Sequence, residues 1–240
     1  MQRALIITIL LSGMACDRLH AGPSLAGPTG VLTIPSALTL SKWEVDASYD
    51  LWNLDSPTGE TSFSSLRGGV GVADQPDGGL EVGLTKPSSN MLNLSDAYIW
   101  GKYRIPGILT GGALAVGGVF STDKRHYSSV FVVGSSAIHE NFTLHYGGGV
   151  NVYGDPMGWA WYGGRRDNGR ANAAFAVFGA QVDIKAFTIN VDYNGSYISY
   201  GVTFFPDSFF SVQAFQLGRG DFERMSGLDH QYGFGVNLRF

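Results

Sequence analysis

Several kinds of residue are scarce in this 240-residue sequence, and each scarcity excludes a class of protein. The one cysteine, Cys16, can build neither a disulfide framework nor a cysteine-based zinc site. Only 15% of the residues are charged, and the net charge of −4 includes no basic excess, so we expect no nucleic-acid partner. Beyond residue 21, no apolar run approaches the ~20 residues of a membrane-spanning helix.

Glycine and aromatic residues are abundant instead. The chain has 34 glycines without a Gly-X-Y period, which excludes collagen. Hydrophobic residues make up 44% of the sequence, more than a disordered chain contains, and aromatic residues make up 13%. Glycine, aromatic and β-branched residues together favour strands.

Residues 1–21 have the pattern of a secretory signal peptide. A short positive start precedes an apolar run over residues 4–11, and small residues follow. Cleavage after Ala15 would leave Cys16 at the new N-terminus, where it could carry a lipid, whereas cleavage after Ala21 would remove it. Both alternatives stay open.

The last ten residues alternate strictly in character. Tyr232, Phe234, Val236, Leu238 and Phe240 lie on one face of an extended chain, and polar or small residues lie on the other. Twelve segments show this period of two, cleanly or less so, at about the ~10 residues of a tilted transmembrane strand. They span 43–51, 62–73, 80–85, 96–104, 110–120, 128–138, 144–152, 172–184, 187–193, 198–204, 209–217 and 231–240. The sequence therefore predicts an all-β, antiparallel, up-and-down transmembrane β-barrel of about twelve strands over 42–240, with ten strands as the alternative.

The connections between these segments alternate in length. Those at 74–78, 105–109, 139–142, 185–186 and 205–208 are short, and most of the others are longer. Short turns at one end and long loops at the other are typical of outer-membrane barrels. An even strand count then places both termini on the periplasmic side.

The sequence ends on Phe240, at the end of the alternating segment. This resembles the closing strand and assembly signal of bacterial outer-membrane barrels. The resemblance implies an outer-membrane location, contact with outer-membrane lipids and lipopolysaccharide, and insertion by the barrel-insertion machinery.

The polar face of the strands would line the lumen. The candidate lining residues are Glu44, Asp46, Asp50, Arg67, Glu81, Asp96, Lys102, Arg104, His145, Asp183, Asp192 and Arg239. They would form either a mutually neutralising network inside a narrow barrel or the charged lining of a selective pore. Small inward residues such as Gly69, Gly71 and Gly83 favour open space, or they accommodate a tucked-in segment or a sharply curved sheet.

A motif precedes the first strand, with the sequence Gly-Pro-Thr-Gly-Val-Leu-Thr-Ile-Pro-Ser-Ala over residues 27–37. It resembles the opening motif of the YjbH-like outer-membrane proteins at Gly30, Leu32, Pro35, Ser36 and Ala37. The resemblance implies a role in exopolysaccharide production or export. Because Pro35 interrupts a strand ladder, we expect residues 22–41 to form a plug in the barrel or a lead-in at its periplasmic mouth.

The sequence offers one candidate for catalysis, the pair His126 and Ser128. Outer-membrane phospholipases resemble this arrangement, in which an activated serine needs a base and a group that orients the base. Nothing nearby in the sequence supplies that third group, and His-x-Ser arises often by chance, so we expect no catalytic residues and no enzyme. The remaining histidines show no metal-ligand spacing, and no phosphate-cradling loop is present, so we expect no metal and no cofactor.

The loop at 154–170 contains candidate binding residues. Its aromatic residues could stack on sugar rings and its arginines could pair with lipopolysaccharide phosphates: Trp159, Trp161, Tyr162, Arg165, Arg166 and Arg170. Alternatively, the aromatic residues belong to the interfacial girdle of the barrel and the arginines are solvated.

The favoured hypothesis is a small passive channel, or an accessory to exopolysaccharide production or export, which would handle small solutes or the polymer. A closed structural or adhesin-like barrel that acts through its loops is the alternative. A lipid hydrolase that uses His126 and Ser128 is the third hypothesis.

Overall fold

The computed structural model describes residues 23–54, 61–75, 78–89, 96–107, 112–123, 125–152, 154, 160–164, 170–218 and 231–240. These residues form twelve strands: β1 (Val45–Leu54), β2 (Thr61–Gln75), β3 (Gly78–Ser89), β4 (Tyr98–Ile105), β5 (Gly112–Ser121), β6 (Ser128–His139), β7 (Phe142–Val152), β8 (Ala174–Ile184), β9 (Phe187–Tyr193), β10 (Ile198–Phe204), β11 (Phe210–Leu217) and β12 (Gln231–Arg239). No helix in this part of the chain is long and apolar enough to cross a membrane. The predicted signal peptide at 1–21, with Cys16, lies outside the described residues.

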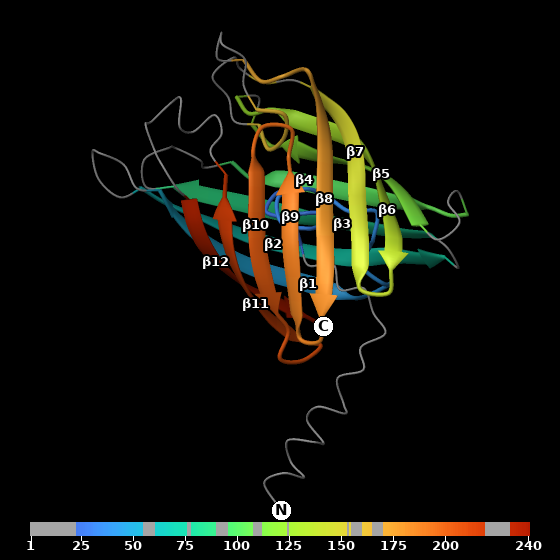
Figure 1. Cartoon of the computed structure of the whole chain (residues 1–240). Helices are drawn as coiled ribbons and strands as arrows, with labels where there is room; N and C mark the ends of the chain where they lie inside the picture. The colour runs from blue at the N-terminus through green and yellow to red at the C-terminus, as the bar shows by residue number, and fades with distance from the viewer. Residues whose placement is uncertain are drawn as a thin grey trace, which may run out of the picture.

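The sheet closes on itself. Each strand pairs antiparallel with its neighbours in chain order, and β1 pairs with β12 from Asp46 opposite Arg239 to Leu54 opposite Gln231. Figure 1 shows the near strands, β7 to β12, crossing those at the back, as tilted strands of a closed barrel do. All twelve predicted segments correspond to strands, so the twelve-stranded up-and-down barrel is confirmed and the ten-strand alternative is wrong.

The outward face of the barrel is apolar. Along β12, Phe234 is 67% exposed and Tyr232 53%, whereas the intervening Gly233 is buried. Phe187 and Phe204 stack on this outer face with ring centroids 4.9 Å apart. An apolar surface that surrounds the whole barrel is unfavourable in water and suits the hydrocarbon of a bilayer.

The two ends of the barrel differ. The turn between β8 and β9 has only two residues, and Lys185 adopts a left-handed conformation there with φ of 56°. Val45 and Phe240 exchange backbone hydrogen bonds of 2.9 Å at the same end, so the wall begins and ends at the short-turn end. The other end carries the longer connections, such as the one between β7 and β8.

Residues 23–37 are all buried in the interior of the barrel, and residues 38–41 lead from there toward β1. Figure 1 shows this blue segment inside the ring of strands. Leu32, Ile34 and Ala37 have no exposed surface, and residues 29–36 form a tight hairpin in which the Val31 N–H donates to the Ile34 carbonyl at 3.0 Å. We call residues 23–41 the inner segment. The hydrophobic core of the protein therefore lies between this segment and the inward face of the wall.

Candidate functional site

Charged side chains of the wall bind the inner segment at three places, and the first is Asp192 on β9. Its carboxylate accepts hydrogen bonds from the backbone N–H groups of Leu32, Thr33 and Ile34 at 3.0, 2.6 and 3.3 Å. The Thr33 hydroxyl donates a fourth hydrogen bond at 2.7 Å. The hairpin thus presents successive backbone N–H groups to one buried carboxylate, as an anion-binding nest does.

Glu81 on β3 and Lys102 on β4 form the second place. They stand opposite each other in the strand register, and Lys102 Nζ lies 3.2 Å from Glu81 Oε1, with both side chains fully buried. Glu81 accepts hydrogen bonds from the Thr29 and Leu40 N–H groups, each at 2.9 Å. Lys102 donates to the carbonyl oxygens of Thr29 and Ser36 at 2.7 and 2.9 Å. The Glu81–Lys102 ion pair therefore provides an acceptor for backbone N–H groups of the inner segment and a donor for its carbonyl oxygens.

Arg67 on β2 forms the third place. Its guanidinium donates to the carbonyl oxygen of Pro23 at 2.9 Å and to that of Ser24, and it pairs with the Asp50 carboxylate from β1. Both charged side chains are almost fully buried, with 2% and 1% exposure. The inner segment contributes no charge at any of the three places, because residues 23–40 contain no charged side chain.

Small inward residues give the inner segment and Trp100 their room. A side chain at Gly71 would overlap the Ser41 carbonyl, and one at Gly83 or Gly69 would overlap the Trp100 indole. These glycines accommodate a tucked-in segment and a large aromatic ring, which was one of the alternatives predicted for them. The interpretation that they leave open space is wrong at these positions.

The other predicted lumen residues take separate places. Glu44 and Asp46 lie beside Arg239 at 3.4 and 3.5 Å, at the seam between β1 and β12. Asp183 accepts hydrogen bonds from two neighbours on the wall, Thr188 at 2.6 Å and Gln181 at 3.1 Å. Arg104 is half-buried on the inward face of β4.

His145 on β7 is buried and contacts the inner segment indirectly. Its Nδ1 lies 2.8 Å from the Ser135 hydroxyl, and the same hydroxyl accepts a hydrogen bond of 2.8 Å from the Ala37 N–H. Sequence reasoning singled out charged residues and missed Ser135 and Thr85, which donates to the Ala26 carbonyl at 3.2 Å. The alternation pattern already placed Thr85 on the inward face.

In the described part of the predicted binding loop, the aromatic side chains are turned away from solvent. Trp161 and Tyr162 are buried, and Tyr162 stacks on Phe175 with ring centroids 5.1 Å apart. Burial raises the pKa of the Tyr162 phenol above its usual range. These two residues were expected in an exposed loop or in the interfacial girdle, and both expectations are wrong because the segment turns inward. Arg170 is exposed, and the remaining candidates, Trp159, Arg165 and Arg166, lie outside the described residues.

An acidic side chain beside His126 is that of Asp96. Its carboxylate lies 2.9 Å from His126 Nε2, and both side chains are only about one-eighth exposed, at 12% and 13%. Ser128 is buried, and its hydroxyl accepts a hydrogen bond of 3.1 Å from the Ser121 N–H. The described residues hold no cluster of ligands that could bind a metal ion.

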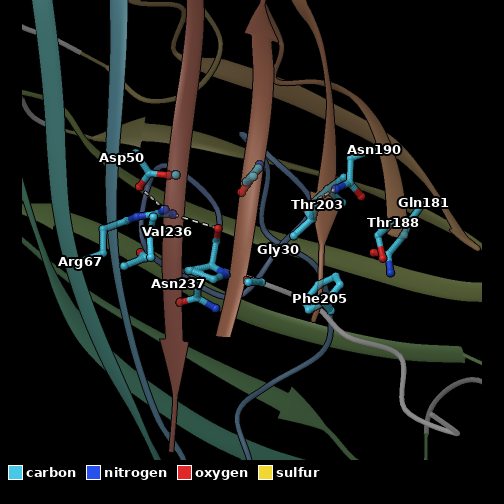
Figure 2. A pocket seen from close by; sticks show the side chains of 16 residues that line it. Gly30, Asp50, Arg67, Gln181, Thr188, Asn190, Thr203, Phe205, Val236 and Asn237 are labelled. Carbon is cyan, nitrogen blue, oxygen red and sulfur yellow. Dashed lines mark hydrogen bonds and ion pairs between the residues drawn. The ribbon is translucent and has the colours of Figure 1, made fainter. Parts of the chain in front are cut away.

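A polar cavity remains between the inner segment and the wall of β8 to β12, β1 and β2. It is small, with a volume of about 20 Å³, which is room for one or two water molecules. Figure 2 shows uncharged side chains lining it, among them Gln181, Thr188, Asn190, Thr203 and Asn237. The Asp50–Arg67 pair lies at one side of the cavity.

Solved structures resemble this fold at low sequence identity. The KdgM porin is similar with a TM-score of 0.52 and 10% identity, over 81% of this chain and 99% of that one. An active-site mutant of outer membrane phospholipase A from Escherichia coli is similar with a TM-score of 0.52 and 11% identity, over 95% and 96%. The likeness shows that the fold is that of an outer-membrane β-barrel. No protein-family model matches the chain, and the comparison with curated proteins finds no match.

Proposed function

We propose that the protein is a channel-type barrel of the bacterial outer membrane, closed at rest by its inner segment. The observation that carries this proposal is that wall charges bind the uncharged segment through its backbone. When the lumen fills with water, hydration replaces those hydrogen bonds, so releasing the segment costs only about 1 kcal/mol for each bond that is lost. The kinship of fold with the KdgM porin supports a channel-type barrel.

The closure must still hold in the resting state. Displacing the segment exposes Leu25, Leu32 and Ile34, which are buried, and each apolar side chain contributes roughly 2 kcal/mol to staying buried. Apolar packing therefore keeps the segment in place, while the polar contacts direct it to one position. A segment that is held by apolar packing and positioned by polar contacts is suited to act as a gate rather than as a permanent core.

The membrane orientation and the biological context are part of the same proposal. We place the short-turn end on the periplasmic side, with lipopolysaccharide around the long-loop end and insertion by the barrel-insertion machinery. The motif at 27–37, which resembles the opening motif of YjbH-like proteins, supports an accessory role in exopolysaccharide production or export. Its residues Leu32, Ser36 and Ala37 are fully buried in the barrel, which gives the motif a structural task as part of the closure.

A conductance measurement tests the proposal. Refolded protein with residues 22–240 is compared in a planar bilayer with a variant that lacks residues 22–40, and heat-modifiable migration verifies that both are folded. We expect a closed state with rare openings in the longer chain and steady conductance in the shorter one. Silence of both folded proteins would favour the closed structural barrel that acts through its loops.

Lipid hydrolysis is a second candidate, favoured by the contact between Asp96 and His126 and by the fold shared with the phospholipase. An acid that orients a histidine is two-thirds of a hydrolytic triad, and Ser128 would have to turn away from the Ser121 N–H to complete it. Phospholipid hydrolysis that disappears in Ser128→Ala would establish this activity. A protein without hydrolysis would rule this candidate out.

A further inference from the structure

We propose that water and ions cross the barrel along one side of the lumen, between the inner segment and the wall of β9 to β12 and β1. The inference rests on the proposed function, because it names the route through such a channel. Three small cavities lie in a row along this side, from the short-turn end to the long-loop end. Widening them needs a small movement of the inner segment and not its removal from the lumen.

The first two cavities adjoin each other. One, of about 10 Å³, lies at the rim of the short-turn end and is lined by residues 208–211 and Arg239. The other is the polar cavity of about 20 Å³. Both are lined by Phe205, Ser211 and Asn237, so the row is continuous from the rim to the middle of the lumen.

The polar middle of the row has groups that bind water. The Ser48 Oγ, Asn190 Oδ1 and Asn237 Oδ1 atoms line this cavity and are buried with no hydrogen-bond partner among the described residues. A buried water molecule makes about two to four hydrogen bonds to such atoms, and the cavity has room for one or two of them. Other uncharged side chains, such as Gln181 and Thr203, surround the same space (Figure 2). We therefore expect water here even while the inner segment is in place.

The third cavity forms an apolar constriction at the long-loop end. It has a volume of about 10 Å³, and Trp52, Trp161 and Leu217 line it opposite Leu25 of the inner segment. All four side chains are buried, and we call them the apolar gate. Hydrophobic constrictions close a pore because water leaves a narrow apolar passage. The row is therefore closed at this point, and a wider gap between Leu25 and the wall would let water through.

The inner segment is tied more firmly on the other side of the lumen. Side chains of β2, β3, β4 and β6 hydrogen-bond to its backbone, namely Arg67, Glu81, Thr85, Lys102 and Ser135. On the side of the cavities, Asp192 on β9 holds the hairpin. In the described part of the chain, no side chain of β10 or β11 hydrogen-bonds to the segment. The hairpin can therefore move away from β10 and β11 while the contacts to β2, β3, β4 and β6 remain.

A polar substitution in the apolar gate is the first test. In Leu217→Asn, an amide holds water in the constriction, so we expect the open probability of refolded protein 22–240 in a planar bilayer to rise at least tenfold. Val119→Asn is the matched control, because Val119 is also buried but lies across the barrel on β5 and lines none of the three cavities. It should leave the open probability near that of the parent. Heat-modifiable migration verifies that both variants are folded.

Cysteine accessibility is the second test, and it does not depend on the folding of those two variants. Protein 22–240 has no cysteine, because the one cysteine of the sequence is Cys16. Ser48→Cys and Ser211→Cys place a thiol in the row of cavities with little change of size. Ser65→Cys and Ala115→Cys place one at buried positions outside the row.

A small cationic methanethiosulfonate is the probe for these thiols. In detergent, mass spectrometry should show that it modifies the two cavity variants at least tenfold faster than the two controls. In the bilayer, it should lower the open-state current of the cavity variants and leave that of the controls unchanged.

Two kinds of outcome would overturn the route. Equal reaction rates in the two pairs of cysteine variants, or equal effects of Leu217→Asn and Val119→Asn, would mean that this side of the lumen is not special. A current that is blocked as readily through Ala115→Cys would mean that the whole segment leaves the lumen, which overturns the route and keeps the channel. Fast modification of Ser48→Cys and Ser211→Cys in a protein that never conducts would instead refute the channel and show only that water reaches these cavities.

Discussion

Glu81 and Lys102 lie fully out of solvent, facing each other across β3 and β4. Glu81→Gln keeps an acceptor for Thr29 but leaves the Lys102 ammonium buried without a counter-charge. Removing one partner of a buried ion pair costs about 3–5 kcal/mol, so we expect a loss of roughly this size in the free energy of unfolding. Urea unfolding in lipid vesicles measures the loss.

The double variant Glu81→Gln with Lys102→Met is the control for this prediction. It removes the isolated charge, so it should recover part of the stability that Glu81→Gln loses. A single variant as stable as the parent would mean that water reaches Lys102 and that the pair does not organise the inner segment.

Gly83 is a second residue whose identity the packing dictates. A methyl group there would overlap the Trp100 indole and the Gly68 carbonyl, and overpacking of this kind costs about 1–3 kcal/mol. We therefore expect Gly83→Ala to lower the urea midpoint. In Gly101→Ala, on the neighbouring strand, the nearest atoms lie 3.6 Å from the new carbon, so the midpoint should stay unchanged. If the two substitutions lowered the urea midpoint equally, the replacement of a glycine in itself, and not the overlap with Trp100, would be the cause.

At the scale of elements, Asp192 on β9 holds the hairpin of the inner segment, although it lies 160 positions from Leu32 in the sequence. Asp192→Ala leaves the N–H groups of Leu32, Thr33 and Ile34 without an acceptor, at about 1–3 kcal/mol for each buried donor. We expect the probability of the open state in single-channel records to rise at least tenfold.

Asp183→Ala is the matched control, because Asp183 is also an inward acid but its side chain bonds to wall residues Thr188 and Gln181. It should leave the open probability near that of the parent. If both variants open the channel equally, a general loss of lumen charge and not the release of the inner segment would be the cause.

The strands were predictable and the inner segment was only partly so, for a physical reason. A strand with one face in lipid repeats with a period of two, so residues such as Tyr232 and Phe234 reveal it locally. The inner segment has no such period, and its contacts join residues far apart, as from Leu32 to Asp192 over 160 positions. The sequence offered a plug or a lead-in, and only those distant contacts distinguish the two.

The same limit applies to Trp161 and Tyr162. Their loop position suggested exposure, but whether a loop folds outward or inward depends on the space that the barrel leaves. Here Tyr162 fits beside Phe131 and Phe175 at the long-loop end of the lumen. No local sequence pattern shows whether the lumen has room for such a side chain.

At the scale of the whole molecule, closure of the barrel depends on the pairing of β1 with β12. Phe240 exchanges backbone hydrogen bonds with Val45 at the end of this seam, and its side chain is 67% exposed on the lipid side. Deleting Phe240 removes both the bonds and the terminal aromatic residue that resembles an assembly signal. We expect the heat-modifiable, folded fraction in outer membranes to fall severalfold, with Phe240→Tyr as the control that retains it. Unchanged insertion would count against the signal.

The ion selectivity of the open barrel depends on the charged side chains of its wall, because residues 23–40 carry no charge. The predicted lumen set has seven acidic and four basic residues, and residues 23–40 add none, so displacing the segment leaves an excess of acids. Water that enters the lumen stabilises the charged forms of these side chains, and a narrow passage focuses their electric field. We therefore expect the variant without residues 22–40 to be cation-selective at 0.1 M KCl, as the reversal potential across a salt gradient will measure. At 1 M KCl the Debye length shrinks to about 3 Å, so the preference should largely disappear. Anion selectivity would mean that Arg67, Lys102, Arg104 and Arg239 dominate the narrowest part, and that the acids remain neutral or paired.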